Sequence, residues 1–192
     1  ELGAISRELG RLTNGHFEAE KNRLYQTGVF QLYETGGLST SEFIDTLCRI
    51  TDPPLAPAQV TAAWNSIFVG MPSRRFELLL QLRQHYQVFL LSNINELHAD
   101  WIDDYMVREH SIRDFQQRYF DAVYYSHLIR LRKPERDIYE YVIADAELVP
   151  NQTIFVDDLK ENIEAAQALG IHIVHKTPEL DIEQWMRSML IR

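Results

Sequence analysis

The chain has 192 residues and a formal net charge of −9, and its hydrophobic and charged fractions are 45% and 24%. This composition is typical of a globular domain and excludes collagen, coiled coil and wholesale disorder. The acidic balance argues against nucleic-acid partners but leaves room for a small phosphorylated ligand, which needs only one lysine and a few backbone N–H groups. Cys48 is the only cysteine, and no apolar run reaches the roughly 20 residues of a membrane span, so we expect a cytoplasmic protein with no membrane segment.

Residues 1 to about 85 predict helices and no strand. Ser39 and Glu42 have the spacing of a capping box ahead of an apolar helical face. Gly36 and Gly37 interrupt the helical stretch before them, and Pro57 opens a later helix. This pattern predicts a small helical unit.

After Tyr86 the pattern changes to four short apolar runs, at residues 88–91, 122–125, 153–156 and 171–174. The first and third runs are continuous rather than alternating, as is typical of strands that are buried on both faces. Helical stretches separate the runs, and such an alternation predicts an α/β fold with a parallel sheet.

The ligand-binding residues of an open parallel sheet lie beyond the carboxyl ends of its strands. Polar residues stand at such positions here: Ser92-Asn93, Lys133 and Asp157-Asp158. Two adjacent acids at the end of a buried strand repel each other, which favours a Mg²⁺ site, although Asp158 alone also suits a helix N-cap. Ser92 either holds a phosphoryl oxygen or caps a helix, and Lys133 either neutralises a ligand or is a solvated loop residue.

Three stretches, residues 89–93, 132–135 and 155–162, resemble motifs II, III and IV of the haloacid dehalogenase (HAD) superfamily. The resemblance covers nearly the whole chain and is strongest to sugar-phosphate phosphatases of the α-glucose-1-phosphatase type. It implies a Rossmann-like parallel sheet, the HAD core, over residues 73–192 and a small α-helical cap over residues 1–72. It also implies a Mg²⁺-dependent phosphatase that acts on a small phosphorylated metabolite as a monomer or homodimer.

The resemblance assigns catalytic and phosphate-binding roles to three positions that match the family motifs. Ser92 is expected to bind the transferring phosphoryl group, with help from the backbone of Asn93. Lys133 is expected to stabilise both the nucleophile and the charge on the phosphoryl oxygens. All three residues stand in motifs II and III.

Metal-binding and supporting roles fall on motif IV. The resemblance implies that Asp158 ligates Mg²⁺, with Asp157 as a direct or an indirect partner, and that Asn162 orients Lys133 or the loop. The histidines show no metal-ligand spacing, and His98 is expected on a solvated helix surface, with a position lining the cleft as the alternative.

Motif I, whose first aspartate is the nucleophile that forms an aspartyl-phosphate, has no match in the sequence. We expect it on a strand ahead of Glu1, at the centre of the sheet between the strands that end at Ser92 and Val156. Alternatives are a metal-independent dehalogenase, a phosphomutase, and a non-catalytic HAD-like binding module that lacks the nucleophile. The intact acid pair argues against the dehalogenase. A response-regulator receiver domain is disfavoured because its acid pair comes from an early strand.

Overall fold

The computed structural model describes residues 3–51 and 53–190, in two compact units. The helical unit consists of the chain up to Met71, Ile94–Arg113 and Ser126–Arg130. The α/β unit consists of Pro72–Asn93, Asp114–Tyr125 and the chain from Leu131 onward. The strand expected ahead of Glu1 lies outside the described residues.

The units differ from the expected division into residues 1–72 and 73–192, because two later segments belong to the helical unit. The Tyr33 hydroxyl accepts a hydrogen bond from the Leu97 N–H at 3.1 Å. The Ser126 hydroxyl donates to the Glu34 carbonyl at 2.7 Å. These bonds join residues that are 64 and 92 positions apart. A division drawn from local sequence patterns therefore misses them.

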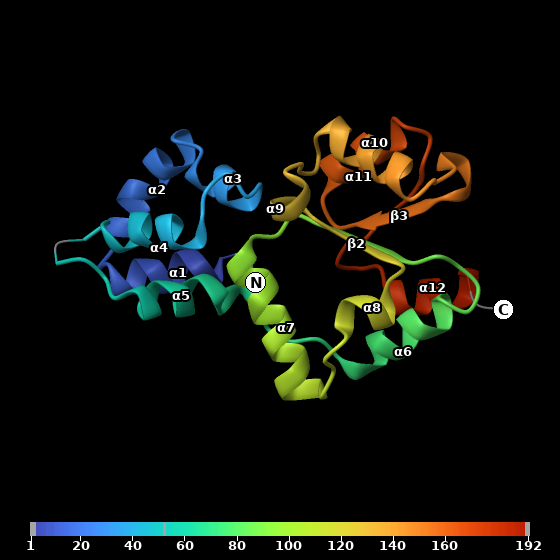
Figure 1. Ribbon diagram of the computed structural model, residues 1–192, viewed down its shortest axis with the longest axis horizontal. Coiled ribbons are helices and arrows are strands. Elements are labelled where there is room, and N and C mark those ends of the chain that lie inside the picture. Colours follow the sequence, from blue (N-terminus) through green and yellow to red (C-terminus); the bar gives the residue numbers. More distant parts are fainter. Residues whose placement is uncertain (1–2, 52, 191–192) are drawn as a thin grey trace. The chain divides into compact units, whose positions relative to one another are not determined.

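As expected, the described residues before Phe89, which include the N-terminal part of the helical unit, contain no strand. The elements of the helical unit are α1 (Ala4–Leu12), α2 (His16–Gln26), α3 (Val29–Glu34), α4 (Thr40–Cys48), α5 (Pro57–Trp64), the 3₁₀-helix η1 (Asn65–Ile67), α7 (Glu96–His110) and α9 (Ser126–Ile129). The helices of its N-terminal part, in blue to green in Figure 1, pack around a shared core.

Local signals determine where several of these helices begin and end. Glu42 N–H donates to the Ser39 hydroxyl at 3.3 Å, and the Ser39 N–H donates to the Glu42 carboxylate at 2.9 Å. The expected capping box of α4 is therefore confirmed. After α3, Gly36 adopts a φ of 65°, and the next N–H donates to the Leu32 carbonyl at 2.7 Å. This left-handed ending favours glycine, which has no Cβ to clash.

Aromatic rings fill the core of the helical unit. Phe43 is fully buried, and its ring centroid lies 4.0 Å from that of Tyr33 and 4.6 Å from that of Trp64. Phe30 stacks on Trp64 at 5.8 Å between centroids. Each large buried side chain contributes roughly 1.5–3 kcal/mol through the hydrophobic effect. These rings therefore act as core residues.

His98 is buried in this unit, so the expectation of a solvated residue is wrong. Its Nε2 donates to the Trp64 carbonyl at 3.0 Å, and its Nδ1 accepts from the Asn95 side-chain amide at 3.2 Å. Both contacts suit a neutral ring with its proton on Nε2, because a proton on Nδ1 would face the amide donor. Burial lowers the pKa of His98, and the bond to Trp64 opposes this only in part.

The free energy of unfolding is expected to fall as the pH drops below about 6.5, the ordinary histidine pKa, because of His98. With a lowered pKa in the folded state, the unfolded chain binds more protons over this range, so acid favours unfolding. Thermal unfolding at several pH values between 7.5 and about 5 checks this. His98→Gln should show a weaker pH dependence than the wild type, whereas the same change at the exposed His16 should not. An equal slope in the His98 variant would contradict the assignment.

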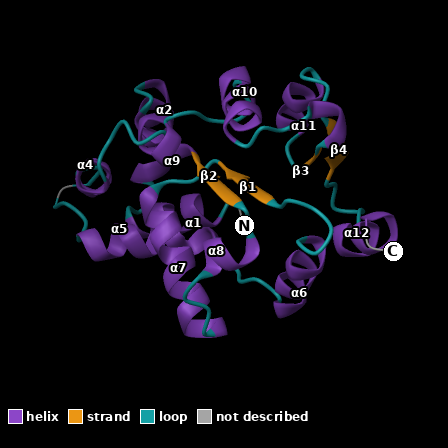
Figure 2. Cartoon of the chain, turned by 45° about the vertical axis from the view of Figure 1, so that its right-hand side comes forward, coloured by secondary structure: helices purple, strands orange, loops and turns teal. Residues whose placement is uncertain are grey.

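Among its described residues, the α/β unit contains four short parallel strands in two pairs. They are β1 (Phe89–Ser92), β2 (Ala122–Tyr125), β3 (Ile154–Asp157) and β4 (His172–His175). β1 pairs with β2, and β3 pairs with β4, so among the described residues the strands form two ladders rather than one (Figure 2). The expected parallel arrangement is confirmed. Three strands begin one residue later than the apolar runs.

Helices cover the strands of this unit on both faces. They are α6 (Ser73–Leu82), α8 (Phe115–Tyr119), α10 (Arg136–Asp145), the 3₁₀-helix η2 (Pro150–Gln152), α11 (Lys160–Gln167) and α12 (Ile182–Leu190). Figure 1 shows α10 and α11 on one side of β3, and α6, α8 and α12 on the other. The α/β fold class is therefore confirmed. Within the described ranges, every helix is too short or too polar to cross a membrane.

Candidate active site

Lys133 connects the carboxyl ends of the two strand pairs. It lies in the loop before α10, and its Nζ donates to the Leu91 carbonyl of β1 at 3.1 Å. The same ammonium donates to the Asp157 carboxylate, at the end of β3, at 2.6 Å. The fold therefore brings a cation and a carboxylate from motifs III and IV together at the sheet edge where the sequence places them.

This ion pair is buried. The Lys133 and Asp157 side chains are only 10% and 7% exposed, and the Nζ lies 5.6 Å from the centroid of the Phe155 ring. Removing one partner of a buried pair leaves the other charge uncompensated, which typically costs about 3–5 kcal/mol. Lys133 is thus a fixed charge and not a solvated loop lysine.

The second oxygen of the Asp157 carboxylate is also occupied. Oδ1 accepts hydrogen bonds from the Leu159 N–H and from the Asn162 side-chain amide, each at 2.9 Å. Burial acts to raise the pKa of Asp157, but these bonds and the Lys133 ammonium outweigh it and hold the pKa below its usual range. Asp157 therefore remains ionised and holds Lys133.

Asn162 contacts the Asp157 carboxylate, and Tyr139 in turn contacts Asn162. Asn162 is 2% exposed, and its backbone carbonyl accepts a hydrogen bond from the Tyr139 hydroxyl at 3.0 Å. Burial, and then the charge of Asp157, raises the pKa of Tyr139, so its hydroxyl stays protonated and able to donate. Tyr139 is not among the site residues predicted from the sequence, because its one local signal is a position beside Ile138 on the buried side of α10.

Asn93 contacts Lys133 through its side chain. Its Oδ1 accepts a hydrogen bond from the Lys133 N–H, and its Nδ2 donates to the Lys133 carbonyl, both at 2.8 Å. The family resemblance implies a role for the Asn93 backbone alone, in phosphate binding. This side-chain contact spans 40 positions and has no signal in the local pattern.

Ser92 and Asp158 lie at the carboxyl ends of β1 and β3, but their side chains take no part in the hydrogen bonds around Lys133 and Asp157. Ser92 is the half-buried last residue of β1, aligned with Tyr125 of β2. Asp158 directly follows β3, is exposed, and has its backbone carbonyl bonded to the His175 ring. Within the described residues, neither the Ser92 hydroxyl nor the Asp158 carboxylate has an assigned hydrogen-bond partner. Both polar groups are therefore available to a ligand.

Asp157 and Asp158 differ in whether their carboxylate oxygens are free to bind a magnesium ion. The described residues contain no group of three or more metal-ligating side chains, and both Asp157 oxygens bind protein donors. The Asp158 carboxylate is free of such bonds. Mg²⁺ commonly takes one or two carboxylates and completes its shell with waters and phosphate oxygens. Of the two acids, Asp158 is therefore the one whose carboxylate could bind Mg²⁺ directly, because both oxygens of Asp157 are occupied.

Comparison with known proteins shows which enzymes the chain resembles. The haloacid dehalogenase-like hydrolase family matches residues 103–176. The D-ribitol-5-phosphate phosphatase of Bacteroides thetaiotaomicron is 32% identical over 171 residues, which cover 88% of this chain and 81% of the relative.

Solved structures agree with the sequence match. A HAD family enzyme of Bacteroides thetaiotaomicron has a TM-score of 0.87 at 29% identity, covering 96% of this chain and 90% of that one. Its complex with magnesium and inorganic phosphate has a TM-score of 0.82 at 30% identity, with the same coverage. The resemblance that motifs II to IV carry is confirmed. The chain belongs to the haloacid dehalogenase-like hydrolase family and is an enzyme of the HAD hydrolase type.

Proposed function

We propose that this protein is a Mg²⁺-dependent phosphatase that hydrolyses a small phosphomonoester, with sugar phosphates as the leading substrate class. The buried Lys133–Asp157 pair is the observation that carries the proposal, because it fixes one positive charge at the strand ends where Ser92 and Asp158 also stand in the chain. The D-ribitol-5-phosphate phosphatase relative, and the magnesium and phosphate complex of the related enzyme, support this choice. The helical unit corresponds to the small cap of the family.

Each residue of the site has a distinct part in this proposal. The Ser92 hydroxyl and the Asn93 N–H bind phosphoryl oxygens, and the Lys133 ammonium neutralises charge that develops on them. Asp158 holds the magnesium ion, which when bound offsets the charge of the phosphoryl oxygens. Asp157, supported by Asn162, keeps Lys133 in place and charged.

The proposed nucleophile is an aspartate on a strand seated between β1 and β3. In the described part of the chain β1 pairs with β2 alone and β3 with β4 alone, so each strand has one edge without a strand partner. Unpaired edge groups favour the addition of a further strand. Because Lys133 bonds to both Leu91 and Asp157, a carboxylate at the end of that strand would lie beside the ammonium.

The reaction in this proposal has two displacement steps. A carboxylate oxygen of the aspartate bonds to phosphorus while the bond from phosphorus to the substrate oxygen breaks, and the leaving oxygen takes a proton from water and departs as the alcohol. Water then attacks the acyl-phosphate, which releases inorganic phosphate and restores the aspartate. Lys133 interacts most strongly with the charge that develops in both transition states.

Phosphate release by the full-length protein tests the proposal. The substrates are D-ribitol 5-phosphate, other sugar phosphates, a nucleoside monophosphate and a chromogenic phosphate ester, each with Mg²⁺ or with chelator. We expect turnover that requires Mg²⁺ and is highest on a sugar phosphate. A 2-haloacid serves as the comparison substrate. Halide release that persists in chelator, without phosphate release, would instead establish the dehalogenase, and no turnover of any substrate would favour a binding module.

A further inference from the structure

The Asn93 side chain binds both backbone groups of Lys133. One amide accepts from the Lys133 N–H and donates to the Lys133 carbonyl, so its oxygen and one of its two amide hydrogens serve a single residue. The Asn93 amide thus satisfies the N–H and carbonyl groups of Lys133, which lie in a loop without a strand or helix partner for them. The amide therefore fixes the position of the Lys133 backbone.

Lys133 is held at both ends by residues that flank Ser92. Its backbone is bonded to Asn93, and its ammonium is bonded to the carbonyl of Leu91. Ser92 stands between these two anchors in the sequence. The lysine side chain has four rotatable bonds, so its ammonium is placed reliably only when both the backbone and the head group are fixed.

We propose that Asn93 is a positioning residue, whose side chain sets the spacing between the Lys133 ammonium and the Ser92 hydroxyl. The inference rests on the proposed phosphatase function for its kinetic consequence. It goes beyond a role of the Asn93 backbone in phosphate binding, because the side chain acts here on the lysine and not on the ligand. Only an amide supplies both an acceptor and a donor in this geometry.

A double-mutant cycle separates action through Lys133 from direct contact with phosphate. Asn93→Ala is expected to lower kcat by about 10-fold or more with little change in KM, because positioning acts on the transition state. In a Lys133→Met background the same change should have less than about a 2-fold further effect. An equal loss in both backgrounds, or no loss in either, would overturn the proposal.

Two further variants sharpen this test. Asn93→Asp keeps the acceptor for the Lys133 N–H but removes the donor to the Lys133 carbonyl, so it should also lower kcat. Asn151→Ala, at an exposed asparagine of the same unit, is the matched control and should leave kcat unchanged. Thermal unfolding of every variant shows whether a lower kcat reflects partial unfolding.

A spectroscopic measurement tests the inference without relying on activity. In protein labelled with ¹⁵N-lysine, the buried Lys133 ammonium should give an exchange-protected signal that is absent from Lys133→Met. Asn93→Ala should shift or broaden that signal, while Asn151→Ala should not. An unchanged signal would overturn the inference even in an active enzyme. A changed signal in a protein without phosphatase activity would instead overturn the proposed function alone.

Discussion

Replacing Lys133 by methionine is expected to lower kcat for phosphomonoester hydrolysis by about 100- to 1000-fold, the usual effect of removing one electrostatic stabiliser. Methionine keeps most of the apolar stem but removes the charge that the Asp157 carboxylate binds. KM should change less than kcat, because the ammonium interacts most with charge that develops in the transition state. Initial rates over a range of substrate concentrations measure both constants.

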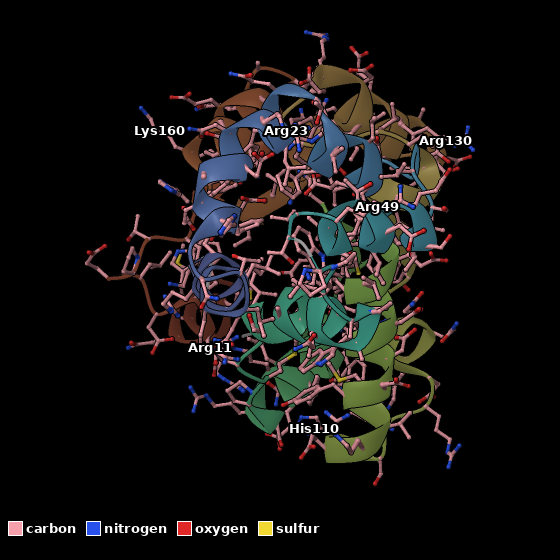
Figure 3. The ribbon with its side chains drawn as sticks, turned by 90° about the vertical axis from the view of Figure 1, so that its left-hand side faces the viewer. Arg11, Arg23, Arg49, His110, Arg130 and Lys160 are labelled. Atoms are coloured by element: carbon pink, nitrogen blue, oxygen red, sulfur yellow. The ribbon has the colours of Figure 1, made fainter. Side chains whose placement is uncertain are left out.

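Lys160→Met is the matched control for this prediction. Lys160, labelled in Figure 3, has a side chain that is 77% exposed and pairs with Glu164 on α11 at 3.2 Å. Its replacement should leave kcat within about 2-fold of the wild type, since exposed pairs of this kind contribute little. Equal activity of the Lys133 variant and the wild type would remove Lys133 from the mechanism.

Gly36→Ala is expected to destabilise the helical unit by about 3 kcal/mol or more. Gly36 has a φ of 65°, which an alanine adopts only with strain, and an added Cβ would lie 2.2 Å from the His127 carbonyl oxygen. That oxygen belongs to the backbone of α9, so it cannot move aside as a flexible side chain can. Chemical denaturation measures the change.

Alanine variants of two other glycines separate the cost of backbone strain at Gly36 from the cost of the clash with His127. Gly28 has a φ of 71° with open space around it, so Gly28→Ala should show the cost of strain alone, about 1 kcal/mol. Gly10 lies within α1 and has no close neighbour, so Gly10→Ala should be neutral or slightly stabilising. If the Gly36 and Gly28 variants were equally stable, the contact with His127 would carry no cost.

Secondary structure was largely predictable because its signals are local. The capping box at Ser39 and the apolar runs before Ser92 and Asp157 each occupy fewer than ten neighbouring positions. The division into units was not predictable, because it depends on long-range hydrogen bonds such as that from Ser126 to Glu34. His98 illustrates the same limit, since a histidine on a charged helix gives no sign that another helix covers it.

For the candidate site, the motif spacing predicted which residues stand at the strand ends but not the contacts between them. Residues after parallel strands meet at one edge, so Lys133 and Asp157 were predictable partners of one site. The side-chain contact of Asn93 and the support from Tyr139 join positions 40 and 23 residues apart. Only the packed fold reveals such contacts, because they depend on how loops and helices meet in three dimensions.

Metal dependence of the Asp158→Asn variant tests the central claim most directly. This change removes one negative charge but keeps nearly the same shape, and Asp137→Asn, at an exposed position of α10, is the control. Phosphate release by the full-length protein is measured over a range of Mg²⁺ concentrations for all three proteins. We predict that the half-saturating Mg²⁺ concentration rises by about 10-fold or more in Asp158→Asn alone. Full activity of the wild type in chelator, or an unchanged midpoint in Asp158→Asn, would contradict the account.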